Sequence, residues 1–254
     1  MNPSTAHRIK RIICLVVDRT AVRGDLLRYV EAAVGAGVDW VQIRDRSLDG
    51  AALLAHAEEV ASAARKAAAK RGAPIEIFVN RRIDIALALG ADGVQLGFDA
   101  LDPSAARRLL ETNDASSQAG NIAIDSRFAS GEENLNTGDT SNESQVGVRA
   151  KIGISAHRPE EIRLAPPEVD FAQLAPIAPP LSKPNDRPCL GVGPIAEAAR
   201  YAIPVIAQGG ITAANATEIA AAGAAGVAVT GAILAAPDPA RATRALRAAL
   251  DAAP

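Results

Sequence analysis

Two glycine-containing segments in the C-terminal half of the chain have the composition of an anion-binding site. The first is a Pro-Val-Ile-Ala-Gln run that ends in Gly209 and Gly210, and the second is a Gly-Val-Ala-Val run that ends in Thr230 and Gly231. Glycine lets backbone N–H groups come close to a phosphate, because no side chain stands in the way. We therefore predict that these four residues bind phosphate. The alternative is that the glycines only turn the chain.

Three polar residues alternate at the end of another apolar run. Gln42, Arg44 and Arg46 occupy every second position of the segment Gln-Ile-Arg-Asp-Arg, so in a strand their side chains point to the same side. Two guanidinium groups and an amide suit a second anionic group or a polar ring. We predict that all three bind substrate, and a solvated strand end with local ion pairs is the alternative.

Amide and guanidinium groups also accompany two further apolar runs. Asn80 and Arg82 follow residues 75–79 and could hold substrate, although Asp84 is placed to pair with an arginine. Gln95 lies inside a short run of apolar residues. We predict that it points into the same end of the fold and contacts substrate. A hydrogen-bonded glutamine of the core is the alternative.

His157 is the one histidine at the end of a predicted strand, in the segment Gly-Ile-Ser-Ala-His, and we predict that Ser155 of the same segment binds substrate. Histidine titrates near neutrality and can act as a general acid or base, so we predict that His157 is catalytic, with a structural histidine as the alternative. A Pro-rich segment further on contains Ser182 and Lys183. We expect these two residues to fold over a bound phosphate, or else to belong to a plain surface loop.

These residues need a scaffold that brings strand ends together, and the hydrophobic pattern predicts one. Strands are predicted at residues 12–17, 38–43, 75–79, 93–96, 151–154, 170–174, 204–207 and 226–229. Helices are predicted between them at residues 25–36, 50–71, 83–89, 103–111, 159–164, 194–201, 212–222 and 237–250. The strands are apolar throughout, as expected when both faces of a sheet are covered.

Eight β–α units predict a single-domain (β/α)8 TIM barrel over residues 12–250, in which the site lies at the C-terminal ends of the strands. An open doubly wound sheet is the alternative, but no G-x-G-x-x-G turn follows the first strand. Residues 113–147 are rich in Ser, Asn, Gly, Glu and Asp without an apolar period, which predicts a disordered low-complexity insertion before the fifth strand. Residues 1–11 are predicted to be an N-terminal tail.

Bulk composition excludes several classes of function. A formal net charge of -2 and 3% aromatic residues argue against nucleic-acid binding. No run of apolar residues is long enough to span a membrane, and the first residues lack the pattern of a secretory signal. Two cysteines without metal-ligand spacing fit a reducing compartment. We expect a cytoplasmic protein whose partner is a small phosphorylated ligand, and we leave homo-oligomerisation open.

Taken in order, these segments resemble the thiamine phosphate synthase and thiazole tautomerase (TenI-like) superfamily from about Ile12 to Leu246. The resemblance rests on the segments Gln-Ile-Arg-Asp-Arg, Asn-Arg-Arg, Gly-Ala-Asp-Gly-Val-Gln-Leu-Gly, Gly-Ile-Ser-Ala-His, Ser-Lys and Gln-Gly-Gly. It implies that the ligand is a phosphorylated thiazole or pyrimidine. Gln42, Arg44 and Arg46 would then bind the pyrimidine and its diphosphate, and the glycine segments would bind thiazole phosphate.

The chain departs from the synthase pattern at two positions. The resemblance implies an aspartate between Asn80 and Arg82 and another after the fourth strand, which together hold Mg²⁺ against the diphosphate. Here these positions are Arg81 and about Ala100, with Asp99 and Asp102 nearby. A hard cation needs carboxylate oxygens, so we predict that no metal is bound and no cofactor is needed.

Three functions remain after these comparisons of motifs. The preferred expectation is a metal-independent thiazole tautomerase-like isomerase on the thiamine pathway, in which His157 moves a proton as acid and base. The first alternative is a thiamine phosphate synthase, a transferase that joins hydroxymethylpyrimidine diphosphate to thiazole phosphate, releases diphosphate and uses Mg²⁺. The second alternative is a non-catalytic barrel that binds phosphorylated ligands.

Overall fold

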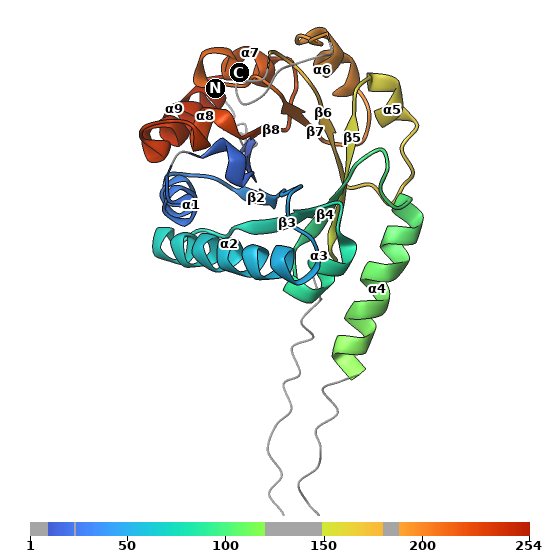
Figure 1. Ribbon diagram of the computed structural model, residues 1–254. Coiled ribbons are helices and arrows are strands. Elements are labelled where there is room, and N and C mark those ends of the chain that lie inside the picture. Colours follow the sequence, from blue (N-terminus) through green and yellow to red (C-terminus); the bar gives the residue numbers. More distant parts are fainter. Residues whose placement is uncertain (1–9, 23, 120–148, 180–187) are drawn as a thin grey trace, which may run out of the picture.

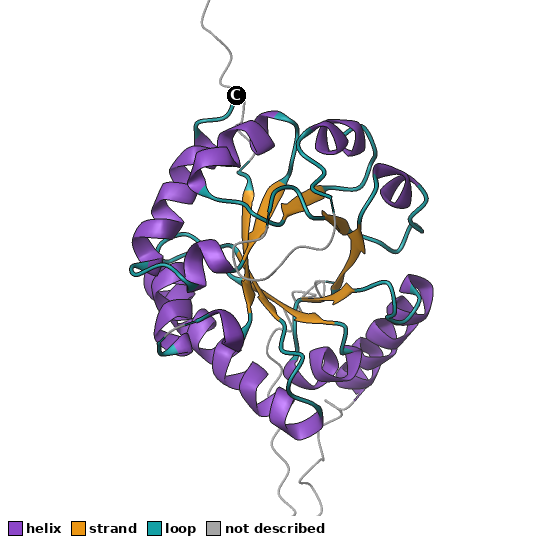
Figure 2. Cartoon of the chain, turned by 45° about the horizontal axis from the view of Figure 1, so that its top comes forward, coloured by secondary structure: helices purple, strands orange, loops and turns teal. Residues whose placement is uncertain are grey.

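The protein is a closed barrel of eight parallel strands surrounded by helices, as the computed structural model shows (Figures 1 and 2). The structure describes residues 10–22, 24–119, 149–179 and 188–254. Strand order around the barrel follows chain order, and β8 pairs with β1 to close it. The predicted TIM barrel is therefore confirmed, and the open doubly wound sheet is wrong.

Short strands alternate with helices of varied length. The strands are β1 (Ile12–Val17), β2 (Trp40–Ile43), β3 (Glu76–Asn80), β4 (Gly93–Leu96), β5 (Lys151–Ala156), β6 (Phe171–Leu174), β7 (Val205–Gln208) and β8 (Gly226–Val229). The helices are the 3-10 helix η1 (Arg19–Ala21), α1 (Leu26–Gly35), α2 (Gly50–Arg71), α3 (Ile83–Leu89), α4 (Pro103–Ala119), α5 (Pro159–Arg163), α6 (Gly193–Ala198), α7 (Ala213–Ala221), α8 (Gly231–Leu234) and α9 (Pro239–Asp251). None of the described helices is long and apolar enough to cross a membrane.

Helix α4 corrects one predicted boundary. It continues to Ala119, so residues 113–119 of the predicted insertion are helical, and residues 120–147 lie outside the described residues. The predicted helix, residues 103–111, was too short because the prediction relied on apolar periodicity, which reports burial of a helix face and not helix formation itself. No glycine or proline interrupts the chain between Pro103 and Gly120. The backbone can therefore stay helical through polar residues.

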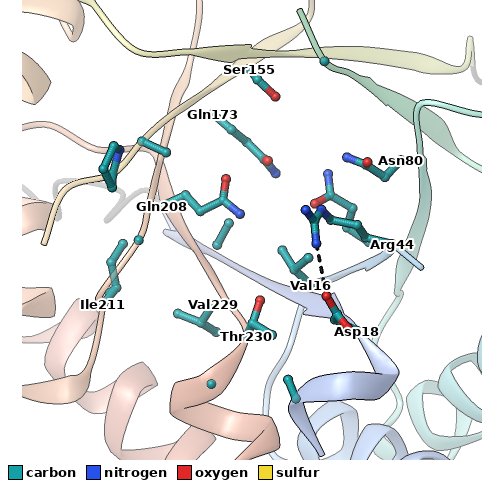
Figure 3. Close-up of a pocket in the computed structure, with 18 of the residues that line it drawn as sticks. Val16, Asp18, Arg44, Asn80, Ser155, Gln173, Gln208, Ile211, Val229 and Thr230 are labelled. Atoms are coloured by element: carbon teal, nitrogen blue, oxygen red, sulfur yellow. Dashed lines mark hydrogen bonds and ion pairs between the residues drawn. The ribbon is translucent and has the colours of Figure 1, made fainter. Parts of the chain in front are cut away.

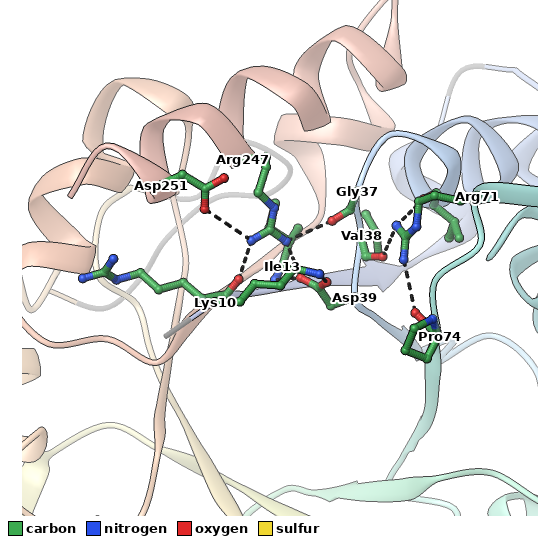
Figure 4. A network of polar contacts seen from close by, with 11 residues as sticks. Lys10, Ile13, Gly37, Val38, Asp39, Arg71, Pro74, Arg247 and Asp251 are labelled. Atoms are coloured by element: carbon green, nitrogen blue, oxygen red, sulfur yellow. Dashed lines mark hydrogen bonds and ion pairs between the residues drawn. The ribbon is translucent and has the colours of Figure 1, made fainter. Parts of the chain in front are cut away.

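The N-terminal ends of three strands are held by the same contact. Asp39, Asp92 and Asp170 stand immediately before or at the start of β2, β4 and β6, and each carboxylate accepts a hydrogen bond from a backbone N–H of the preceding strand, at 2.9, 2.7 and 2.8 Å. Asp39 also pairs with Arg247 of α9, which ties the last helix to the first two strands (Figure 4). These contacts fix the register of neighbouring strands at the end of the barrel opposite the predicted site.

Aromatic rings fill the barrel interior on the side of the N-terminal ends of the strands. Trp40, Phe78 and Phe171 pack against one another with ring centroids 4.8, 4.9 and 5.3 Å apart, and all three are buried. They come from β2, β3 and β6, and side chains of this kind fill the interior of a TIM barrel as a packed core. Because the rings close this end of the barrel, the interior can open to solvent only at the C-terminal ends of the strands.

Between the aromatic rings and the C-terminal ends of the strands, the barrel interior is polar. Gln42, Gln95 and Gln173 each come three residues after one of the aspartates that precede β2, β4 and β6, so they occupy equivalent places in those strands. Their exposed fractions are 1%, 0% and 2%. We call these three residues the glutamine layer. It separates the apolar part of the core from the mouth of the barrel.

Candidate active site

A cavity of about 670 Å³ lies at the C-terminal ends of the strands, and it is lined by residues on or just after all eight of them. Figure 3 shows its side chains converging from different walls of the barrel, with Gln173 and Gln208 reaching in from one side toward Arg44 and Asn80. This is where catalytic residues of a TIM barrel lie.

Gly209 and Gly210 follow β7 with backbone conformations that glycine adopts readily, at φ values of 96° and 62°. A Cβ on Gly210 would come within 2.5 to 2.6 Å of the carbonyl groups of Ala178 and Pro179, so no other residue fits there. Within the described residues, the N–H groups of the two glycines have no hydrogen-bond acceptor. Donors left in this way at a cavity wall can bind an anion.

Thr230 and Gly231 add donors to the same wall. Thr230 is the residue before the short helix α8, and Gly231 is its first residue. The sequence did not predict this helix, because four residues are too few to show a helical period. The first N–H groups of a helix have no partner within it, and loops after the seventh and eighth strands often hold phosphate. The four predicted phosphate-binding residues all line the cavity.

A second wall of the cavity carries guanidinium groups. Arg44 and Arg46 lie just beyond β2, and Arg81 lies just beyond β3. Arg44 pairs with Asp18 at 3.1 Å. Burial lowers the pKa of Arg44, and so do the positive charges of Arg46 and Arg81, whereas Asp18 opposes the shift. Around the closed barrel, the guanidinium wall (after β2 and β3) and the glycine wall (after β7 and β8) are separated by β1 on one side and by β4, β5 and β6 on the other.

The floor of the cavity consists of amide groups. Gln42 and Gln173 line it from the glutamine layer, and neither Nε2 atom has a hydrogen-bond partner within the described residues. Gln95 donates to the hydroxyl of Ser155 at 3.2 Å, and its Oε1 has no partner within the described residues. Buried amide groups are normally hydrogen-bonded, so these atoms indicate that a polar ligand or water completes the floor.

His157 stands at the rim, after β5. Its Nδ1 lies 2.6 Å from the carbonyl oxygen of Ala175. A carbonyl oxygen only accepts hydrogen bonds, so Nδ1 carries the proton and Nε2 is the basic nitrogen of the neutral ring. The imidazole also stacks on Phe98, which is 60% exposed. These contacts fix the orientation of a group that can accept a proton at the mouth of the cavity.

Most of the predicted site residues line this one cavity, and of the described ones Gln95 and Arg82 do not. Gln42, Arg44, Arg46, Asn80, Ser155 and His157 line it together with the four phosphate-binding residues. Gln95 lies beneath the cavity surface and supports Ser155, which matches the alternative of a core glutamine. Arg82 makes two hydrogen bonds to Asp84, at 2.8 and 2.6 Å, and is not among the lining residues. Ser182 and Lys183 lie outside the described residues.

Reasoning from the sequence missed four polar lining residues: Asp18, Thr20, Gln173 and Gln208. Gln173 had a usable signal, because it follows Asp170 at the same spacing that separates Asp39 from Gln42 and Asp92 from Gln95. Asp18 directly follows β1, and a polar residue at the end of a predicted strand could have been recognised as a candidate in the same way as Arg44. Gln208 ends β7 directly before the glycine pair, and the prediction at this segment named only the two glycines.

The family model described as thiamine monophosphate synthase matches residues 13–115 and 132–233, which is most of the chain. The chain belongs to this family. The thiamine-phosphate synthase of Roseiflexus castenholzii is 31% identical over 96% of this chain and 90% of its own length. That of Azorhizobium caulinodans is 34% identical, with 95% of each chain covered. The solved structure of thiamine phosphate pyrophosphorylase from Pyrococcus furiosus, at 23% identity, has the same fold, with a TM-score of 0.68 and 96% of each chain covered.

Family membership confirms the resemblance inferred from the motifs and makes the protein an enzyme of thiamine biosynthesis. The metal that the synthase pattern implies does not fit the residues present. Arg81 stands at the first metal position and pairs with Asp99 at 2.8 Å, while Asp102 accepts hydrogen bonds from the N–H groups that open α4. The described residues contain no group of three or more His, Cys, Asp or Glu that could hold a metal ion.

Proposed function

We propose that the protein is a thiamine-phosphate synthase, which joins a pyrimidine diphosphate to thiazole phosphate and releases diphosphate. The observation that carries this proposal is the presence of two anion-binding walls in one cavity, with backbone N–H groups at Gly209, Gly210 and Gly231 and guanidinium groups at Arg44, Arg46 and Arg81. A synthase must hold two phosphorylated substrates together. The names of the curated relatives support the same reaction.

In this mechanism each wall holds one substrate. Thiazole phosphate binds through its phosphate to the glycine wall, and the diphosphate of the pyrimidine binds to the guanidinium wall. Unpartnered amides of Gln42 and Gln173 donate to acceptor atoms of the pyrimidine ring. The bond from the methylene carbon to the diphosphate oxygen breaks, and the thiazole nitrogen forms a bond to that carbon. Holding both reactants in one cavity supplies the proximity that the reaction needs.

The test is formation of thiamine phosphate from the two substrates by the full chain, measured by chromatography. Gly210→Ala is expected to abolish product and to weaken binding of thiazole phosphate at least tenfold, because its methyl group meets two carbonyl groups. Gly90→Ala is the matched control. Gly90 also has a positive φ, of 58°, but a Cβ there meets nothing within 4 Å. Absence of product from folded wild-type protein would reject the proposal.

A thiazole tautomerase is the second candidate, and the oriented imidazole of His157 favours it. An isomerase of this kind needs a proton acceptor at the cavity and no metal. The two candidates separate when the same protein is offered each set of substrates. Conversion of a thiazole carboxylate phosphate to its aromatic tautomer, without formation of thiamine phosphate, would establish the isomerase.

A further inference from the structure

The guanidinium wall has more positive than negative charge. Three guanidinium groups, those of Arg44, Arg46 and Arg81, line it, and two carboxylates are paired with them, Asp18 with Arg44 and Asp99 with Arg81. Within the described residues Arg46 has no ion-pair partner at all. Like charges gathered at one wall repel each other unless an anion lies between them. The surplus positive charge of this wall therefore points to an anionic ligand.

The backbone at Arg81 directs its side chain into this wall. Its φ of 68° makes Arg81 the one non-glycine residue with a positive φ in the part of the chain that the structure describes. A side chain in this conformation costs about 1 kcal/mol or more, so the surroundings must hold it. They do so through its N–H, which donates to the carbonyl of Gln95 at 2.8 Å. As a result Arg81 lines the cavity, while the next residue, Arg82, pairs with Asp84 away from it.

We propose that Arg81, together with Arg44 and Arg46, binds the diphosphate of the pyrimidine substrate in place of a divalent cation. This inference rests on the proposed synthase function. When the carbon–oxygen bond breaks, its electron pair stays on the departing diphosphate, and the guanidinium groups stabilise that charge. The new carbon–nitrogen bond takes its electrons from the thiazole nitrogen, so no oxidant or reductant is required.

A guanidinium group is suited to this role because its planar array of donors can hold two phosphate oxygens at once and its charge persists at all physiological pH values. Asp99 is a positioning residue. Its carboxylate lies 2.8 Å from the Arg81 guanidinium and is 68% exposed, so it can hold the side chain in place and still leave donors for a ligand. Diphosphate release by this protein is therefore independent of added metal.

Calorimetric titration of inorganic diphosphate into the full chain, in buffer with EDTA, tests the inference. Wild-type protein is expected to bind, and replacing EDTA by Mg²⁺ is expected to change the affinity less than threefold. Arg81→Ala should weaken binding at least tenfold, and Arg81→Lys should weaken it less. Arg82→Ala is the matched control. It removes the same charge from the next residue along the chain, whose side chain lies outside the cavity. Binding by the control should equal that of the wild type.

Two further variants at position 81 test the inference even if Arg81→Ala does not fold. Arg81→Gly removes the guanidinium while relaxing the left-handed backbone, so it covers the case in which Arg81→Ala does not fold. Arg81→Asp is expected to make diphosphate binding depend on Mg²⁺. Binding that requires Mg²⁺ in the wild type, or undiminished binding by Arg81→Gly, would overturn the inference. If diphosphate binds as expected but no thiamine phosphate forms, the anion site stands and the proposed synthase function falls.

Discussion

The imidazole of His157 stacks on the ring of Phe98 with 4.6 Å between the ring centroids and 27° between their planes. This contact joins a residue after β5 to the loop that follows β4. Together with the hydrogen bond from Nδ1 to the carbonyl of Ala175, it holds the imidazole in one orientation at the cavity rim. Because the placement of the imidazole is fixed, the reaction that the protein catalyses decides whether His157 acts as an acid and base.

Replacement of His157 separates the two candidate reactions. The synthase reaction exchanges a carbon–oxygen bond for a carbon–nitrogen bond and needs no proton removed from carbon. We expect His157→Ala to lower thiamine phosphate formation by less than about tenfold, and to lower any tautomerase turnover by about 100-fold or more, as is typical when a general base is removed. Phe98→Leu serves as the control, because it keeps the imidazole and loses only the stacking. Steady-state rates with each substrate set provide the measurement.

Gln173→Leu is expected to raise the stability of the fold and to weaken binding of the pyrimidine substrate. The Nε2 of Gln173 is buried without a partner within the described residues, and replacing an unsatisfied buried amide by an apolar group of similar size removes a penalty of about 1 kcal/mol. The melting temperature should rise by about 2–4 °C. The KM for the pyrimidine substrate should rise at least tenfold, because the ring loses a donor. A KM equal to that of the wild type would remove Gln173 from the binding site.

The loop after β2 should lose stability in acid through Asp45. Burial by itself raises the pKa of Asp45, but hydrogen bonds from Arg19 and Ser47 outweigh it and lower the pKa to about 2. A carboxyl group whose pKa is lower in the folded state stabilises the fold above its unfolded value of about 4, and this contribution is lost as the pH falls toward 2. Asp45→Asn should therefore melt below wild type at pH 7, and the difference should shrink between pH 4 and pH 2. A difference that is the same at both ends of this range would contradict the assignment.

Arg107 contributes to stability on the side of the barrel away from the cavity. It is 5% exposed, and its guanidinium donates to the carbonyls of Ala150 and Glu168 and pairs with Asp170 at 2.8 Å. Arg107→Met leaves the two carbonyls without this donor, while Asp170 keeps Arg149 and the N–H of Ile152, and the expected cost is about 2 kcal/mol. Chemical denaturation measures the loss. The neighbouring exposed Arg108→Met is the control and should change stability by less than about 0.5 kcal/mol.

Much of this architecture could be predicted from the sequence because buried parallel strands and their helices leave strong local patterns. The bounds of α2, α3 and β4 agree with the prediction residue by residue. Most cavity residues were also found, because strand ends meet at one mouth and polar residues there stand out against apolar runs. The direction of Arg81 and Arg82 could not be predicted, since it depends on a backbone conformation that is set by a contact with β4. The roles of Gln95 and Gln173 depended on depth within the barrel, which alternation alone does not give.

The aspartates at the start of β2, β4 and β6 also bear on how the barrel is assembled. Each contact is complete within one pair of adjacent strands, whereas Ala225 stands before β8 and offers no such carboxylate to β7. The first three strand pairs can therefore become locally stable as separate folding units, and the last pair depends on closure of the ring through Arg247 and Asp39. Native-state hydrogen exchange should find the lowest protection in β7 and β8, so the strands that carry the glycine wall belong to the part of the barrel that opens most readily.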